Sequence, residues 1–284
     1  MALTINTNMS SIVAQSNLNK ATKTLNQSIE RMTTGFKINH AADNAAGYSI
    51  SKNWETQISS LDIAADNAAT GADMLTTLED TYSLISSHLQ RVRDLTEQAA
   101  NGTYGTQSLK AIQSEMTARL EEVDRIAANC EFNGLKMMDG SMQDVSLQVG
   151  LYSNADSQIT LASDLFKKGD INSLFKEDIA TVASKCSGLT TGTTANSMLK
   201  KIDGVINEIS GRVTTLGAAQ NRIDSAIESI GVQSENLTSS LSTLRDADVA
   251  NESSNYIKSQ ILQQAAATLL ATANQSPSIA LNLI

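Results

Sequence analysis

The sequence predicts a mainly α-helical fold: an elongated antiparallel helical bundle or coiled coil, with a small β-hairpin and a variable insertion at one end and paired terminal helices at the other. One proline in 284 residues, Pro277, leaves long helices uninterrupted. Hydrophobic residues make up 41% of the chain but aromatics only 4%, which suits a thin helix-on-helix seam. Apolar residues also recur at heptad spacing, as Leu75, Leu78, Tyr82, Ile85, Leu89 and Val92.

The heptad seam belongs to a predicted helix over residues 44–101, which would be roughly 85 Å long and needs a partner along its length. A short loop after Asn101-Gly102 predicts that a second helix, over residues 107–129, folds back as a hairpin. The remaining partner is a second long run with the same periodicity: Ile202, Val205, Ile209, Val213, Leu216, Ala219, Ile223, Ala226, Ile230, Leu237, Leu241 and Leu244. We expect the two long helices to pack antiparallel.

Both chain ends predict amphipathic helices, over residues 1–34 and 249–273, with Gly35 as the stop of the first. Their apolar stripes are expected to pair with each other. The remaining faces of small Ala, Ser, Asn and Gln residues are expected to receive neighbouring copies of the chain. An ordinary helical bundle with polar, uncharged ends is the alternative.

Between the helical regions the period changes to two, at residues 145–149 and 159–161, with turn-forming residues between them. This predicts a β-hairpin. Residues 163–196 lose clear periodicity, although 165–185 allow a short helix, and residues 188–197 are predicted to be a flexible polar loop. The predicted division is a terminal domain of residues 1–43 with 248–284, a bundle domain of 44–162 with 199–247, and a variable outer insertion of 163–198.

Composition argues against several functions. A net charge of −9 and no clustering of basic residues argue against a nucleic-acid-binding surface. No apolar run reaches the length of a membrane span, and the first residues lack the pattern of a secretory signal. His40 and His88 lie in no ligand or triad spacing, so we predict no enzyme, no metal and no cofactor. Cys130 and Cys186 favour two free thiols over one disulfide.

Several long stretches resemble the two terminal regions of bacterial flagellin, over about residues 1–150 and 199–284. They are ALTINTNMSSIVAQSNLNKAT, RMTTGFKINHAADNAAGYSI, LQRVRDLTEQAANGT, RLEEVDRIAANCEFNG, LGAAQNRIDSAI and LRDADVANESSNYIKSQILQQAAATLLATANQSPSIALNLI. The residues between them resemble nothing we can name. A hook–filament junction protein is the alternative, but the stretches QILQQA and LATANQSP favour flagellin, because these stretches match less closely in junction proteins. A secreted coiled-coil adhesin is a weaker alternative.

The resemblance implies a structural subunit that polymerises into the hollow flagellar filament for motility, with terminal helices that order on assembly. It implies an extracellular location, export without a cleavable signal peptide, and export chaperone, cap and junction proteins as partners. A Toll-like receptor of a host is a further implied partner, at Arg91, Leu95 and Glu115. The implied polymerisation residues of the terminal helices are Ile5, Ile12, Leu18, Leu25, Ile29, Ile261, Leu262, Leu269 and Leu270.

Overall fold

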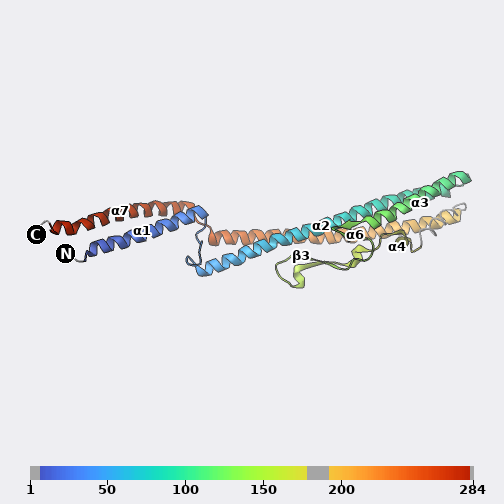
Figure 1. The fold of residues 1–284 in the computed structure, drawn as a ribbon. Coiled ribbons are helices and arrows are strands. Elements are labelled where there is room, and N and C mark those ends of the chain that lie inside the picture. The colour runs from blue at the N-terminus through green and yellow to red at the C-terminus, as the bar shows by residue number, and fades with distance from the viewer. Residues whose placement is uncertain (1–6, 178–191, 282–284) are drawn as a thin grey trace. The chain divides into compact units, whose positions relative to one another are not determined.

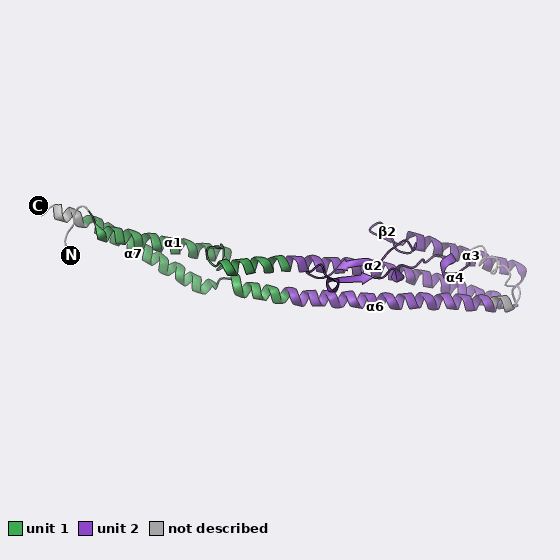
Figure 2. Ribbon diagram, turned by 90° about the horizontal axis from the view of Figure 1, so that it is seen from below, with its two compact units in different colours: residues 1–58, 235–284 green, residues 59–234 purple. Residues whose placement is uncertain are grey.

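The computed structural model describes residues 7–177 and 192–281 and is mainly helical, as predicted (Figure 1). The chain divides into two compact units, residues 1–58 with 235–284 and residues 59–234 (Figure 2). Its helices are α1 (Met9–Thr34), α2 (Ala45–Ala100), α3 (Thr106–Asn129), α4 (Ile171–Phe175), α6 (Gly192–Arg245) and α7 (Val249–Leu281). Short strands β1 (Glu131–Phe132), β2 (Leu135–Lys136), β3 (Val145–Gln148) and β4 (Gln158–Leu161), with 3-10 turns η1 (Ala155–Ser157) and η2 (Ser163–Phe166), follow α3.

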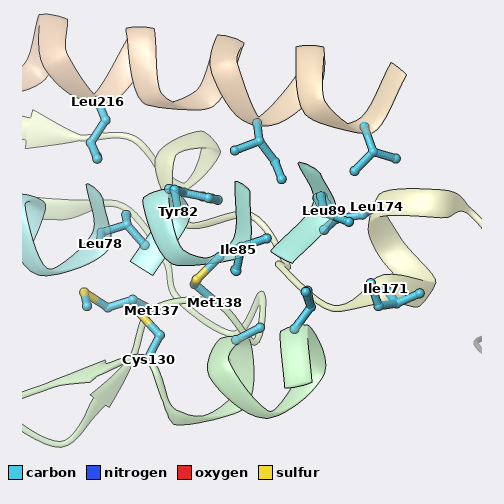
Figure 3. Packing of buried hydrophobic residues seen from close by; sticks show 14 of the residues in the cluster. Leu78, Tyr82, Ile85, Leu89, Cys130, Met137, Met138, Ile171, Leu174 and Leu216 are labelled. Carbon is cyan, nitrogen blue, oxygen red and sulfur yellow. The ribbon is translucent and has the colours of Figure 1, made fainter. Parts of the chain in front are cut away.

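The second unit, residues 59–234, is built around the predicted heptad seam of α2. Every one of its six seam residues is at most 1% exposed, and they share one hydrophobic cluster with residues of α3 and α6. Figure 3 shows Leu78, Tyr82, Ile85 and Leu89 of α2 in this cluster, with Leu216 of α6 on one side. The sequence prediction of this seam and its partners is confirmed.

The direction of the pairing follows from polar contacts along the seam. Glu79 accepts a hydrogen bond from Gln220 at 2.9 Å, and Arg93 donates to Asp203 at 2.7 Å. Because the residue numbers rise along α2 while they fall along α6, the two helices run antiparallel. The predicted hairpin of α2 and α3 is also present, and Met116, Leu120, Val123 and Ala127 of α3 are buried.

Residues after β4 contribute to the same core, which the periodicity did not indicate. Leu165, Phe166, Ile171, Leu174 and Phe175 are all less than 9% exposed and belong to the hydrophobic cluster. Figure 3 places Ile171 and Leu174 beside Leu89. The contacting segment is short: η2 and α4 together span few residues, so no apolar period can be read from them.

One detail of this region corrects the sequence analysis. Helix α6 begins at Gly192, so residues 192–197 of the predicted polar loop are helical. Residues 178–191, including the rest of that loop and Cys186, lie outside the described residues. Cys130 is a buried free cysteine, and burial raises the pKa of its thiol.

Two hairpins follow α3. The first has Asn133 and Gly134 in its turn at φ 53° and 81°, the left-handed values that a tight two-residue turn needs. The second pairs β3 with β4 antiparallel, with Val145 opposite Leu161 and Gln148 opposite Gln158. The predicted β-hairpin is therefore confirmed.

The second hairpin packs against α2 at a glycine. A Cβ atom at Gly71 would lie 2.3 Å from Leu147 Cδ1 and 3.3 Å from its Cγ, so any larger residue there would force the Leu147 side chain to move. Asn67 Nδ2 donates to the Gln148 carbonyl at 3.2 Å one helical turn earlier. The hairpin is thus held on α2 by a close approach and one hydrogen bond.

We expect Gly71→Ala to destabilise the chain by about 1 kcal/mol, because the clash with Leu147 outweighs a gain in helix propensity of roughly 1 kcal/mol. Gly204→Ala is the matched control, since nothing lies within 4 Å of a Cβ there and propensity alone should stabilise α6. Urea unfolding of both variants measures the difference. Equal stabilisation by the two substitutions would contradict the close approach.

Candidate assembly interface

Helix α1 has defined signals at both ends. Asn8 is its N-cap, and its side-chain oxygen accepts a hydrogen bond from the Ser11 amide at 3.2 Å. Gly35 ends the helix at φ 75°, and its amide donates to the Arg31 carbonyl at 2.8 Å. The sequence predicted this stop.

Helix α7 lies antiparallel beside α1 (Figure 1), as the order of their cross-contacts shows. Asn8 and Ser11 of α1 donate to the Ala273 carbonyl and to Asn274, at 2.6 and 2.7 Å, near the end of α7. Arg31, at the other end of α1, pairs with Glu252 at 3.9 Å. The pairing of the terminal helices is therefore present within one chain.

Helix α7 extends to Leu281, beyond the predicted end at Ala273, and includes Pro277. Proline has no amide hydrogen, so it cannot donate to the carbonyl four residues earlier, which is that of Ala273. The Asn8 side chain supplies a donor to that carbonyl. One residue thus serves both as the N-cap of α1 and as a partner for the carbonyl that the proline leaves free.

The face between α1 and α7 is small and polar. Ala14, Ser28, Glu252, Ser259 and Ala266 are buried, at 2–8% exposure. Leu18 and Leu25 of α1 and Leu270 of α7 lie at seam spacing with these residues and are half-buried, so the predicted apolar stripes meet in part. Small side chains let two backbones approach closely, which large aliphatic side chains would prevent.

Many large apolar side chains of the pair remain exposed. Ten of the 17 exposed large hydrophobic residues found among the described residues lie on these two helices. They are Met9 (62%), Ile12 (52%), Val13 (54%), Ile29 (43%), Met32 (37%), Val249 (59%), Ile257 (52%), Ile261 (60%), Leu262 (50%) and Leu269 (64%). We call this set the outer apolar face. Apolar exposure on this scale marks a surface that another molecule covers.

A groove of about 620 Å³ runs between the two helices. Its lining combines small residues such as Ala21 and Ala265 with Leu262 and Leu269 of the outer apolar face. The groove and the face together form a ridged surface with both apolar and polar positions. Such a surface can receive another helix.

The predicted polymerisation residues have different positions on this pair. Ile12, Ile29, Ile261, Leu262 and Leu269 belong to the outer apolar face. Leu18, Leu25 and Leu270 are half-buried. Ile5 lies outside the described residues.

The connecting segments of the first unit are joined by a short clamp that the sequence analysis missed. Phe36 and Asp246 form an antiparallel β-bridge. The Lys37 amide donates to the Arg245 carbonyl at 2.7 Å, and Lys37 Nζ donates to the Thr243 carbonyl at 2.8 Å. These donors satisfy carbonyls that the end of α6 leaves unpaired.

Arg245 completes the clamp. Its guanidinium lies over the Phe36 ring, 4.1 Å from the centroid, and pairs with Glu55 of α2. The Arg245 side chain is only 12% exposed, so both contacts are largely shielded from water. Neither an isolated arginine nor a phenylalanine carries a sequence signal for such a contact.

We expect Arg245→Met to lower the free energy of unfolding of the first unit by about 1–3 kcal/mol, because it removes the stacking and leaves Glu55 with a weaker partner. Lys52→Met is the control: Lys52 pairs with the same Glu55 at 2.8 Å but is 49% exposed, so its loss should cost under ~0.5 kcal/mol. Hydrogen exchange of residues 36–48 reads out the effect. Similar exchange in the two variants would refute the clamp.

The residues implied for receptor recognition lie in the second unit. Arg91 and Glu115 pair across α2 and α3, with Nε and Nη2 each 3.0 Å from Oε1, and their side chains are 43% and 38% exposed. Leu95 is 1% exposed and belongs to the core. Its side chain does not reach the surface on which the arginine and glutamate lie.

An antiparallel helical subunit that leaves large apolar side chains uncovered on its terminal helices is a self-associating structural protein. The family is specified by two matches, to the bacterial flagellin N-terminal helical region over residues 5–143 and to the bacterial flagellin C-terminal helical region over residues 199–284. The chain belongs to the bacterial flagellin family. It is a structural subunit of the flagellar filament and not an enzyme.

Individual relatives agree with this assignment over their whole length. The chain is 35% identical to a flagellin of Xenorhabdus nematophila, covering 100% of both chains, and 33% identical to a flagellin of Bacillus subtilis, covering 99% of both. Among solved structures, a protein described as a flagellar hook-associated protein from Vibrio parahaemolyticus matches with a TM-score of 0.62. That match has 14% identity and covers 72% of this chain and 100% of the other, so it shows the shared fold alone.

Proposed function

We propose that this flagellin assembles through the outer apolar face of α1 and α7, which neighbouring subunits cover in the filament. The observation that supports this is the inverted distribution of side chains. The pair buries small and polar residues within itself and exposes ten large aliphatic or Met side chains. Each such side chain contributes roughly 1.5–3 kcal/mol when it is fully buried, so assembly has a large apolar driving force.

The experiment is seeded polymerisation. Protein heated to monomers and cooled with filament seeds should form long filaments, and deletion of residues 1–30 or 250–284 should abolish them. Electron microscopy and sedimentation measure the yield. Full-length protein that stays monomeric under these conditions would refute the proposal.

Ordering of the terminal helices on assembly is part of the proposal. Polar Asn, Ser and Thr make α1 intrinsically weak, and the residues that it buries completely against α7 are small or polar. Amide exchange in the monomer should therefore be fast before Gly35 and after Ala247 and slow from Leu61 to Leu95. Uniform protection along the monomer would contradict coupled ordering.

The same proposal assigns three regions of the chain to different places in the filament. Residues 1–43 with 248–284 form the inner part of the filament, and residues 44–162 with 199–247 form the next layer. Residues 163–198 belong to the outer side of that layer, where Phe166 and Leu174 anchor the segment in the bundle core. Export proceeds without a cleavable signal peptide and brings contacts with chaperone, cap and junction proteins. The junction-protein alternative has no observation in its favour.

Recognition by a host Toll-like receptor at Arg91 and Glu115 is a further part of the proposal. The burial of Leu95 limits that residue to holding α2 in place. Arg91→Ala with Glu115→Ala should weaken binding of the monomer to such a receptor by tenfold or more. Arg125→Ala with Glu122→Ala, which removes another exposed Arg–Glu pair, is the matched control. Unchanged affinity in the first variant would refute this surface.

A further inference from the structure

The nine methionines of the chain differ sharply in exposure. Five lie in the core of the second unit and are at most 4% exposed: Met74, Met116, Met137, Met138 and Met198. Met9 and Met32 of α1 are 62% and 37% exposed. Met142 is half-buried, and Met1 lies outside the described residues. Because an oxidant must reach the sulfur, α1 carries the two most accessible thioethers among the methionines that the structure describes.

Each exposed methionine lies beside exposed aliphatic side chains of its own helix. Met9 is in the first turn of α1, three and four positions before Ile12 and Val13. Met32 is in the last turn, three positions after Ile29. These neighbours belong to α1 alone, so pairing with α7 is not needed to bring them together. An α1 that has not yet ordered exposes the two sulfurs at least as far.

We propose that Met9 and Met32 are oxidation sites through which peroxides keep the unassembled chain out of the filament. The inference rests on the proposed assembly through the outer apolar face and adds a means of regulating it. A lone pair of the thioether sulfur attacks one oxygen of hydrogen peroxide, and the O–O bond breaks. The sulfur loses two electrons and becomes a sulfoxide, while the peroxide is reduced to water. Methionine sulfoxide reductases reverse the step, oxidising two thiols to a disulfide and releasing the oxygen as water.

The sulfoxide changes what assembly has to bury. Its oxygen is a hydrogen-bond acceptor that water satisfies in the monomer. Burial among aliphatic side chains such as Ile12 and Ile29 removes that water, and a polar group buried without a partner costs free energy. The oxidised chain should therefore assemble only at a higher concentration. The five core methionines are shielded in the monomer, so its fold should survive the treatment.

The test is mild oxidation of the monomer with hydrogen peroxide, followed by seeded assembly. Peptide mass spectrometry should find sulfoxide at Met9 and Met32 well before Met74 or Met116. The critical concentration should rise at least about tenfold, while the circular dichroism of the monomer stays unchanged. Methionine sulfoxide reductases A and B with a thiol reductant should restore assembly. Unchanged assembly of a chain that carries both sulfoxides would overturn the inference.

Leucine variants assign the effect to the two sulfurs. Met9→Leu with Met32→Leu removes both thioethers at nearly constant apolar volume, so treated and untreated protein should assemble alike. Met142→Leu is the matched control, because it removes the half-buried methionine and should stay as sensitive as the unmodified chain. Both variants keep Cys130 and Cys186. Equal sensitivity of the two variants would place the effect at another group and overturn the inference.

Two further measurements keep the outcome decisive. If the double leucine variant assembles poorly without peroxide, the reductase experiment on the unmodified chain decides. Assembly that does not return once both sulfoxides are reduced would then overturn the inference. Seeded assembly of the untreated chain is measured in parallel and tests the assembly proposal by itself. Normal assembly before oxidation and after it would therefore refute only the role of Met9 and Met32.

Discussion

Ile261→Asp is expected to abolish filament formation while leaving the monomer folded. Ile261 is 60% exposed on the outer apolar face of α7, so its replacement should change monomer stability by no more than about 0.5 kcal/mol. In a filament the carboxylate would be covered without a partner, which costs roughly 3–5 kcal/mol per subunit. The critical concentration should therefore rise at least about 100-fold.

Tyr152→Asp provides the control for that experiment. Tyr152 is 64% exposed, close to the value for Ile261, but it lies in the loop between β3 and β4 of the second unit and not on a terminal helix. We expect its filament yield to match that of the unmodified chain in light scattering and electron microscopy. Normal assembly of Ile261→Asp, or an equal defect in both variants, would show that the outer apolar face does not carry the assembly.

Phe166→Ala is expected to lower the free energy of unfolding of the second unit by about 3–5 kcal/mol, because it empties a site at which the ring is 1% exposed. The reason lies in packing: the segment after β4 supplies part of the core around α2 and α3. Urea unfolding followed by circular dichroism measures the loss. Amide exchange in α2 near Leu89 should accelerate in parallel.

Lys167→Ala tests whether the effect of Phe166→Ala belongs to the core. Lys167 is the next residue, with its side chain 49% exposed and paired with Asp164 at 3.1 Å, so we expect a loss under ~0.5 kcal/mol. A small effect in both variants would mean that residues 163–175 cover the bundle only loosely.

The long seams were predictable because their period is a direct consequence of burial. Residues three and four positions apart lie on the same side of a helix, so the neighbours of Leu89 at that spacing face the partner helices with it. All of these seam residues are buried. The turn at Asn133 and Gly134 was predictable for a similar local reason, since few residues adopt left-handed backbone angles. The resemblance to flagellin extended these local inferences to assembly.

The candidate interface was predicted in position, but only part of each apolar stripe lies in it. Periodicity identified an apolar stripe on each terminal helix, and hydrophobic burial suggested that the stripes would meet. The structure buries Ala14, Ser28 and Ser259 most completely and leaves Ile261 exposed. The rotation of each helix about its axis decides how much of a stripe the partner covers, and the sequence does not state that rotation.

The sequence by itself thus determined the helices, their periodic seams, the β3–β4 hairpin and the family. Each of these depends on residues that are close in the sequence or repeated at a fixed period. Only the tertiary structure decided how much of the apolar stripe of α1 meets α7, that Phe166 and Leu174 complete the core, and that Arg245 joins Phe36 to Glu55. Those contacts connect residues distant in the chain and depend on shape and close approach, for which a single sequence has no local signal.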